Sequence, residues 1–139
     1  MQDPRIKLEL RIDWSEMDLF GHVNNLSILK YVQSARANYL ENIGMLQTYT
    51  ENKIGPILAA CNCQFIKPLF YPGQVRIYSK VETIKNTSFS ILHEIRNGQN
   101  EIIAEAKDVI VYYDFIENTK LKLTEEIKFH LMEFVGNEF

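Results

Sequence analysis

The most constraining feature of this sequence is a long apolar helical pattern over residues 26–43, in a chain whose other segments are typical of strands. Apolar side chains recur there at helical spacing, and the stripe consists of Ile28, Val32, Ala35, Tyr39 and Ile43. Leu29, Tyr31 and Leu40 widen it, so the sequence predicts a helix covered on most of its sides. Asn24 or Asn25 suits its start and Gly44 its end.

The remaining segments predict strands and one shorter helix. Alternation of apolar and polar residues or short apolar runs predict strands at 5–13, 57–66, 74–84, 88–96 and 101–113. Asn97-Gly98 indicates a hairpin between the last two strands. A helix over 124–135 follows Thr124 as its N-cap. Burying one long apolar helix is achieved most economically by an antiparallel sheet that curves around it, which predicts an α+β fold.

Length and charge narrow the function classes. The 139 residues predict a single domain over 1–139, and a net charge of −3 with scattered cations argues against nucleic acid as a partner. No apolar run is long enough for a membrane helix, and the first residues do not resemble a signal peptide. We therefore expect a cytoplasmic protein without a membrane partner.

The two cysteines give little indication of a metal site. Cys61 and Cys63 fall on one face of a predicted strand, and no further Cys or His pair stands ready to complete a zinc site. We predict two small buried residues, no bound metal and no disulfide between them.

The polar run DWSEMDLFGHVNN at residues 13–25 carries the chemistry. It places carboxylates, a glycine, an imidazole and two amides directly before the helix, where unpaired backbone N–H groups and the helix dipole favour negative charge. These are groups that a site needs in order to polarise a carbonyl and activate water.

With this motif placed before the long helix, the chain resembles hotdog-fold acyl-CoA thioesterases of the 4-hydroxybenzoyl-CoA thioesterase type. The resemblance rests on residues 14–25, and it extends to Tyr31, Ala35-Arg36, Phe65, Pro68 and Ser88-Phe89. It implies a curved sheet of about five strands around the long helix and a short C-terminal helix. It also implies hydrolysis of acyl-CoA to free acid and coenzyme A without a cofactor, in a homodimer or homotetramer with sites at the subunit interface.

Within this resemblance, Asp18 matches the acidic residue and the backbone N–H at Asn25 matches the group that polarises the thioester. Whether Asp18 is general base or nucleophile stays open, and a capping carboxylate is its non-catalytic alternative. His22 either orients the substrate or holds the loop. Asn24 is a cap that also stands beside the substrate. Glu16, a second acidic position of the motif, is interpreted as a solvated loop carboxylate, and Glu41 lies too near the helix end to be the base.

Several further residues have two interpretations. Tyr31 and Phe65, with Phe70 and Tyr71, either line an acyl pocket or belong to the core. Ser88 or Thr87 is a contribution from the partner subunit or an ordinary strand hydroxyl. His93 is interpreted as a core histidine. Four cations either meet coenzyme A phosphates or form a solvated face: Arg76, Lys80, Lys85 and Lys107.

Two other function classes remain open. A hotdog hydratase or dehydratase would use an Asp and His pair, for which Asp18 and His22 are a loose match. A non-catalytic acyl-binding module would have the same fold but no catalytic activity. Neither the acyl class nor the choice between coenzyme A and a carrier protein follows from the sequence, although the acidic charge favours coenzyme A. The motif differs from that of plant-type acyl-carrier-protein thioesterases at Phe20, two residues after Asp18, where those enzymes have an Asn.

Overall fold

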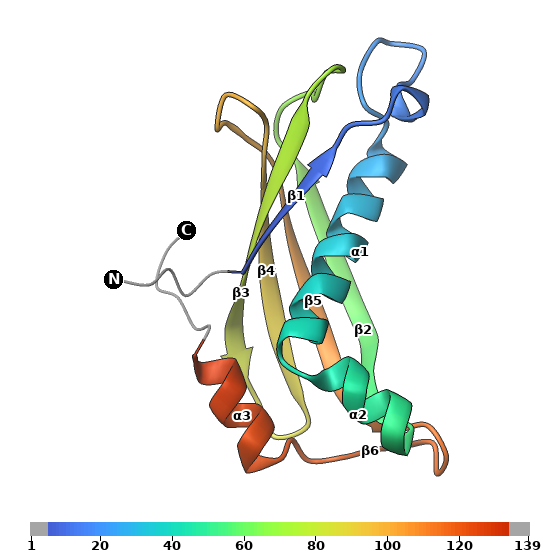
Figure 1. Cartoon of the computed structure of the whole chain (residues 1–139), viewed down its shortest axis with the longest axis vertical. Helices are drawn as coiled ribbons and strands as arrows, with labels where there is room; N and C mark the ends of the chain where they lie inside the picture. The colour runs from blue at the N-terminus through green and yellow to red at the C-terminus, as the bar shows by residue number, and fades with distance from the viewer. Residues whose placement is uncertain (1–5, 134–139) are drawn as a thin grey trace.

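The computed structural model describes residues 6–133 (Figure 1). The strands are β1 (Ile6–Arg11), β2 (Ile54–Phe65), β3 (Gln74–Ile84), β4 (Ser88–Arg96), β5 (Ile102–Asp114) and β6 (Thr119–Lys120). The helices are α1 (Asn25–Asn42), α2 (Met45–Asn52) and α3 (Glu125–Met132), and a 3-10 turn, η1 (Trp14–Glu16), follows β1. Within the described residues, no helix is long and apolar enough to cross a membrane.

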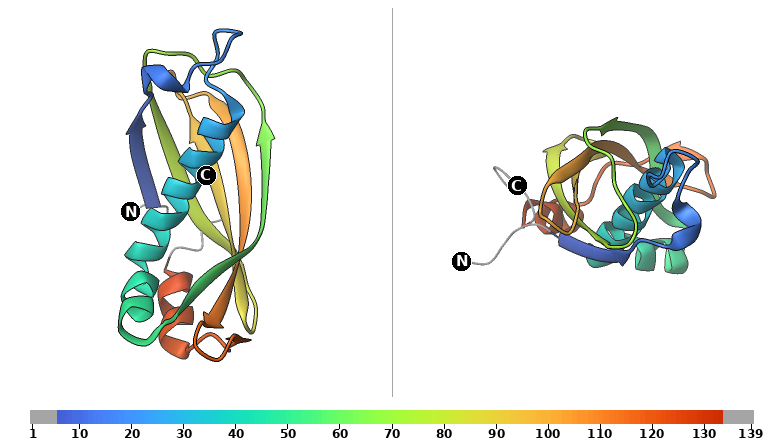
Figure 2. Two further views of the ribbon diagram at one scale, coloured as in Figure 1. Left: turned by 90° about the vertical axis from the view of Figure 1, so that its right-hand side faces the viewer. Right: turned by 90° about the horizontal axis from the view of Figure 1, so that it is seen from above.

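The strands form one antiparallel sheet in the order β1-β3-β4-β5-β2, with β6 paired to β5. The sheet curls around α1, and the views from the side and from above show the helix lying along its concave face (Figure 2). This is the hotdog fold, and it confirms the predicted α+β architecture of a curved sheet, a long helix and a short C-terminal helix.

The long helix forms for the reasons that its sequence indicates. Asn24 caps it, because its side-chain oxygen accepts a hydrogen bond from the Ser27 N–H at 2.8 Å. The predicted apolar stripe is buried against the sheet. The opposite face carries exposed Leu26 and Leu29, so the prediction that the helix is covered on most sides is wrong for a single chain. The sheet reaches only one face of α1.

The core consists of two apolar clusters separated by a polar layer. One cluster surrounds the first half of α1 and the other surrounds its end and α2. Between them lie three buried polar residues on three neighbouring strands, Ser79 on β3, His93 on β4 and Asp108 on β5. These three residues form the polar layer that separates the two apolar clusters.

Three features differ from the predictions. Residues 45–52, for which no element was predicted, form a short helix without a side-chain cap, and buried Met45 anchors it. The strand β2 lies at the sheet edge, so Cys61 is exposed and Cys63 half-buried, and both are free thiols. The prediction of two buried cysteines is therefore wrong. Lys80, expected either to meet coenzyme A phosphates or to lie on a solvated face, is buried.

Candidate active site

The loop that precedes α1 is closed on itself by backbone hydrogen bonds. Met17 and Val23 form an isolated antiparallel bridge, and the Asp18 N–H donates to the His22 carbonyl at 2.7 Å. Gly21 has a φ of +80°, which lies in the left-handed region that glycine adopts without a steric penalty. The sequence therefore produces a tight turn with Asp18 at one end and the start of α1 at the other.

The Asp18 carboxylate is held by the backbone of its own loop. Its Oδ1 accepts hydrogen bonds from the N–H groups of Phe20 at 2.9 Å and His22 at 3.2 Å. Because both bonds go to Oδ1, the orientation of the carboxylate is fixed by one of its two oxygens. The arrangement suits a carboxylate that must present its other oxygen in a set direction.

A cavity of about 380 Å³ lies beside this loop, between the start of α1 and the segment that follows β2. Four of the predicted site residues line it together: Asp18, His22, Asn25 and Phe65. Its apolar wall comes from Val23, Ile28, Ile66, Pro68 and Leu69. A carboxylate, a helix start and an apolar wall thus share one cavity.

Asn25 is the first residue of α1, so its backbone lies at the positive end of the helix dipole. N–H groups in the first turn of a helix have no acceptor within the helix. A negative charge that develops in the cavity would be stabilised by this helix end.

Asn24 and Tyr31, two predicted substrate-binding residues, do not line the cavity, and their side chains bind Glu16 instead. Asn24 uses its amide N–H₂ to donate to the Glu16 carbonyl at 2.9 Å. Tyr31 is buried and donates its hydroxyl to Glu16 Oε1 at 2.8 Å, and burial together with this carboxylate raises the pKa of the Tyr31 hydroxyl. Glu16 itself is part-buried and hydrogen-bonded, so its interpretation as a solvated carboxylate is wrong.

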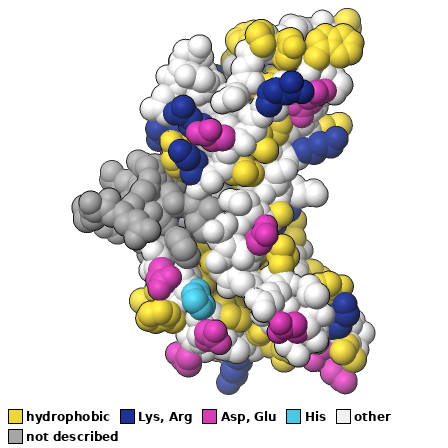
Figure 3. All heavy atoms as spheres, in the orientation of Figure 1, with side chains coloured by type: hydrophobic (Ala, Val, Ile, Leu, Met, Phe, Trp, Pro, Cys, Tyr) yellow, Lys and Arg dark blue, Asp and Glu magenta, His cyan; other side chains and the backbone are white. Residues whose placement is uncertain are grey.

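Other predicted contributors lie elsewhere in the chain. Ser88 is the first residue of β4, and β4 begins at the end of the sheet opposite to the loop before α1 (Figure 1), so one chain does not bring Ser88 to Asp18. Phe70 packs its ring edge-on against His22, with 5.1 Å between the ring centroids, which restricts the imidazole. Exposed apolar side chains gather at this end of the molecule (Figure 3), and those of Leu19 and Phe20 are 94% and 80% exposed.

The predicted cations do not line the cavity. Arg76 and Lys107 form ion pairs with Glu9 and Glu82 on the strands. Lys67, which the sequence reasoning did not single out, does line it and donates to Glu101 at 2.7 Å. Its place directly before Pro68, in the turn after β2, is the only sequence signal that could have indicated it.

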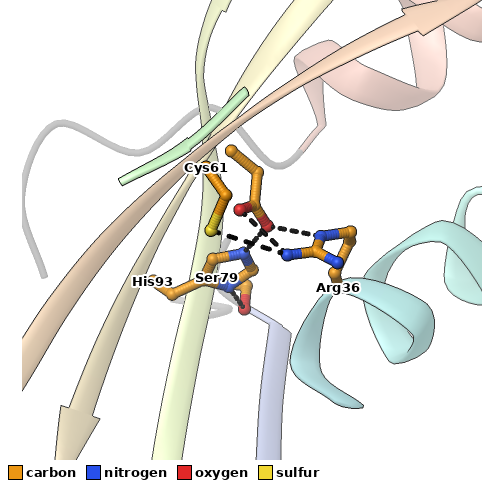
Figure 4. A network of polar contacts seen from close by, with 5 residues as sticks. Arg36, Cys61, Ser79 and His93 are labelled. Carbon is orange, nitrogen blue, oxygen red and sulfur yellow. Dashed lines mark hydrogen bonds and ion pairs between the residues drawn. The ribbon is translucent and has the colours of Figure 1, made fainter. Parts of the chain in front are cut away.

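The buried polar layer of the core is a hydrogen-bonded network (Figure 4). The Asp108 carboxylate accepts from His93 Nε2 at 2.7 Å and from Arg36 Nε at 2.8 Å, and Ser79 Oγ lies 2.7 Å from His93 Nδ1. Burial opposes the charge on Asp108, but these partners together hold its pKa at about 2. Cys61 extends the network from β2, with its sulfur 3.8 Å from Arg36 Nη2. The interpretation of His93 as a core histidine is confirmed.

Known proteins are similar to this chain over nearly its whole length. The long-chain acyl-CoA thioesterase FadM of Escherichia coli is 23% identical over 132 residues, which are 94% of this chain and 99% of that protein. A structure described as a predicted thioesterase from Bacillus stearothermophilus superposes with a TM-score of 0.86 at 20% identity, covering 97% and 99% of the two chains.

A 1,4-dihydroxy-2-naphthoyl-CoA thioesterase from Synechocystis is also similar, with a TM-score of 0.80 at 14% identity, covering 92% of this chain and 96% of that one. The family model of the thioesterase-like superfamily matches residues 12–131, which include the loop, α1, every strand except β1, and most of α3. The chain therefore belongs to the thioesterase-like superfamily.

Proposed function

We propose that this protein hydrolyses acyl-CoA thioesters to the free acid and coenzyme A. The observation that carries the proposal is the meeting of the Asp18 carboxylate and the α1 start at Asn25 in one partly apolar cavity. Thioester hydrolysis needs a base or nucleophile beside the carbonyl carbon and donors for the oxygen that becomes negative. The family and the similarity to a long-chain acyl-CoA thioesterase support the same activity.

In the proposed reaction, the thioester carbonyl lies between Asp18 and the first turn of α1. Asp18 either takes a proton from the attacking water or attacks the carbonyl carbon itself, and the backbone N–H at Asn25 stabilises the oxyanion. The C–S bond then breaks, and coenzyme A leaves as its thiol with a proton from the water that is consumed. If Asp18 attacks directly, the acyl group stays on it as an anhydride, and that water hydrolyses the anhydride to the free acid. His22, whose ring packs against Phe70, holds the loop and orients the substrate.

The acyl group would lie against Phe65 and the apolar wall that includes Ile28 and Leu69. The similar proteins act on substrates as different as long-chain and naphthoyl-CoA esters. The choice among acyl classes is therefore left to measurement, and we favour coenzyme A over an acidic carrier protein because the chain is itself acidic.

We further propose that the protein is a homodimer or a dimer of dimers. The edge strand β2 exposes Ile57 and Leu58 beside its unpaired backbone edge, which favours pairing with another strand. Antiparallel pairing of β2 with its copy would bring the opposite end of the second sheet toward the cavity. The partner's Ser88 is our proposal for the group that reaches it from there.

The proposal is tested by release of free thiol from short-chain, long-chain and aromatic acyl-CoA esters, with enoyl-CoA hydration followed in parallel. We expect catalytic thiol release from at least one class and no addition of water to the enoyl chain. If water is added instead, Asp18 and His22 serve a hydratase. If neither reaction occurs while an acyl-CoA analogue binds, the protein is a binding module.

A further inference from the structure

Glu16 is a carboxylate that the proposed reaction does not use. It ends the η1 turn directly before the loop, and its side chain gathers two donors on one oxygen. Oε1 accepts from the Asp13 backbone N–H at 2.7 Å and from the Tyr31 hydroxyl at 2.8 Å. The first bond completes a capping box with Asp13, and the second ties the turn to the second turn of α1.

The backbone of Glu16 makes a second pair of contacts, on the other side of the residue. Its carbonyl accepts from the Asn24 N–H at 2.9 Å and from the Asn24 side-chain amide at 2.9 Å. Asn24 is the N-cap of α1, so this carbonyl fixes the residue immediately before Asn25. One residue thus connects the end of β1, the closing point of the loop and the body of the helix.

The two groups that act on the thioester are close in sequence to the residues that Glu16 holds. Asp18 follows Glu16 by two residues, and the Asn25 N–H follows the Asn24 cap directly. We propose that Glu16 is the positioning residue of this site, setting the separation of the Asp18 carboxylate from the oxyanion-stabilising helix start. The inference rests on the proposed hydrolysis. It needs no contact between Glu16 and substrate.

A direct chemical role for Glu16 is disfavoured by the same geometry. Two donors already occupy Oε1, and Glu16 is not among the residues that line the cavity. A displacement of only about 1 Å in a reacting group can cost roughly a hundredfold in rate, so a residue that controls position has a large effect on kcat.

The test compares Glu16→Ala, Glu16→Gln and Tyr31→Phe with Glu41→Ala, a matched control that removes an exposed carboxylate from α1. Gln keeps an oxygen that accepts both hydrogen bonds, whereas Ala keeps neither. We expect Glu16→Ala to lower kcat by about 10- to 100-fold with KM changed less than about threefold. The kcat values of Glu16→Gln and Glu41→Ala should stay within about threefold of the wild type. The kcat of Tyr31→Phe should lie between those of Glu16→Gln and Glu16→Ala.

Backbone amide hydrogen exchange gives a readout that does not depend on activity. Glu16→Ala should accelerate exchange at His22 and Asn24, while Glu16→Gln preserves protection there. Equal loss of kcat in the Ala and Gln variants would overturn the proposal in favour of a role for the charge. Unchanged kcat or unchanged loop exchange in a folded Glu16→Ala protein would overturn it outright. A wild type without thioesterase activity would contradict the proposed function, and the exchange data would still decide the positioning.

Discussion

Two aspartates in this protein are held in different ways. Asp108 is fully buried, and its charge is neutralised by the Arg36 guanidinium and a hydrogen bond from His93. Asp18 accepts hydrogen bonds from two backbone N–H groups of its own loop and faces a cavity. The buried carboxylate has no room to react and stabilises the fold, whereas the cavity carboxylate can meet a substrate.

The pairing of Asp108 predicts a pH dependence of stability. Its pKa in the folded protein is lowered from 3.8 to about 2, so the stabilisation is fully present above about pH 4 and is lost as the pH falls toward 2. Over the range from about pH 5 to 2, we expect the difference in free energy of unfolding between wild type and Asp108→Asn to shrink as the pH falls below about 4. Urea unfolding across this range measures it, and a difference that grows in acid would contradict the assignment.

At the scale of elements, the start of α1 both stabilises the helix and belongs to the site. Asn24 caps α1 as Thr124 caps α3, each through a side-chain oxygen that accepts a backbone N–H. The two caps are chemically similar, but only the first lies next to the cavity.

Replacement of each cap by alanine separates these roles. We expect Asn24→Ala and Thr124→Ala each to cost about 1 kcal/mol of stability, from loss of the cap. Only Asn24→Ala should also reduce kcat, because its amide additionally binds the Glu16 carbonyl beside the loop. Thermal unfolding and steady-state kinetics are the measurements. Equal activity of the two variants would show that the cap has no part in the site.

The periodic elements were predictable, and the short or edge elements were not. The strict apolar spacing from Ile28 to Ile43 identified α1, and Asn97-Gly98 identified the hairpin. The helix α2 is short and has Gly44 as its N-cap, without a side-chain hydrogen bond, so its sequence gave no start signal. The two cysteines of β2 were predicted to be buried, but the sheet order places that strand at the edge. Sheet order depends on contacts distant in sequence.

The site was predictable where chemistry and chain proximity coincide. Asp18, His22 and Asn25 lie within one short motif, and they line one cavity. The sequence left Tyr31 open between an acyl pocket and the core, because the direction of its hydroxyl depends on Glu16, fifteen residues away. Lys67 was missed because a single cation in a turn carries no pattern of its own.

At the scale of the whole molecule, the open edge of the sheet predicts self-association. Leu58→Lys puts a charge on the exposed β2 edge, and charged edge residues oppose strand pairing. We expect the wild type to sediment as a dimer or tetramer and Leu58→Lys to shift toward the monomer. Leu46→Lys, at a similarly exposed position on α2, serves as the control and should leave the assembly unchanged. A monomeric wild type would contradict the interface.

The most direct test of the account is the rate of acyl-CoA hydrolysis by Asp18→Asn. Asn keeps the shape and the Oδ1 acceptor but removes the charge and basicity. Asp114→Asn is the control, because Asp114 also accepts from two backbone N–H groups, in a turn that does not line the cavity. We expect Asp18→Asn to lower kcat at least about a hundredfold and Asp114→Asn to leave it within about twofold. Undiminished hydrolysis by Asp18→Asn would contradict the assignment of this carboxylate to catalysis.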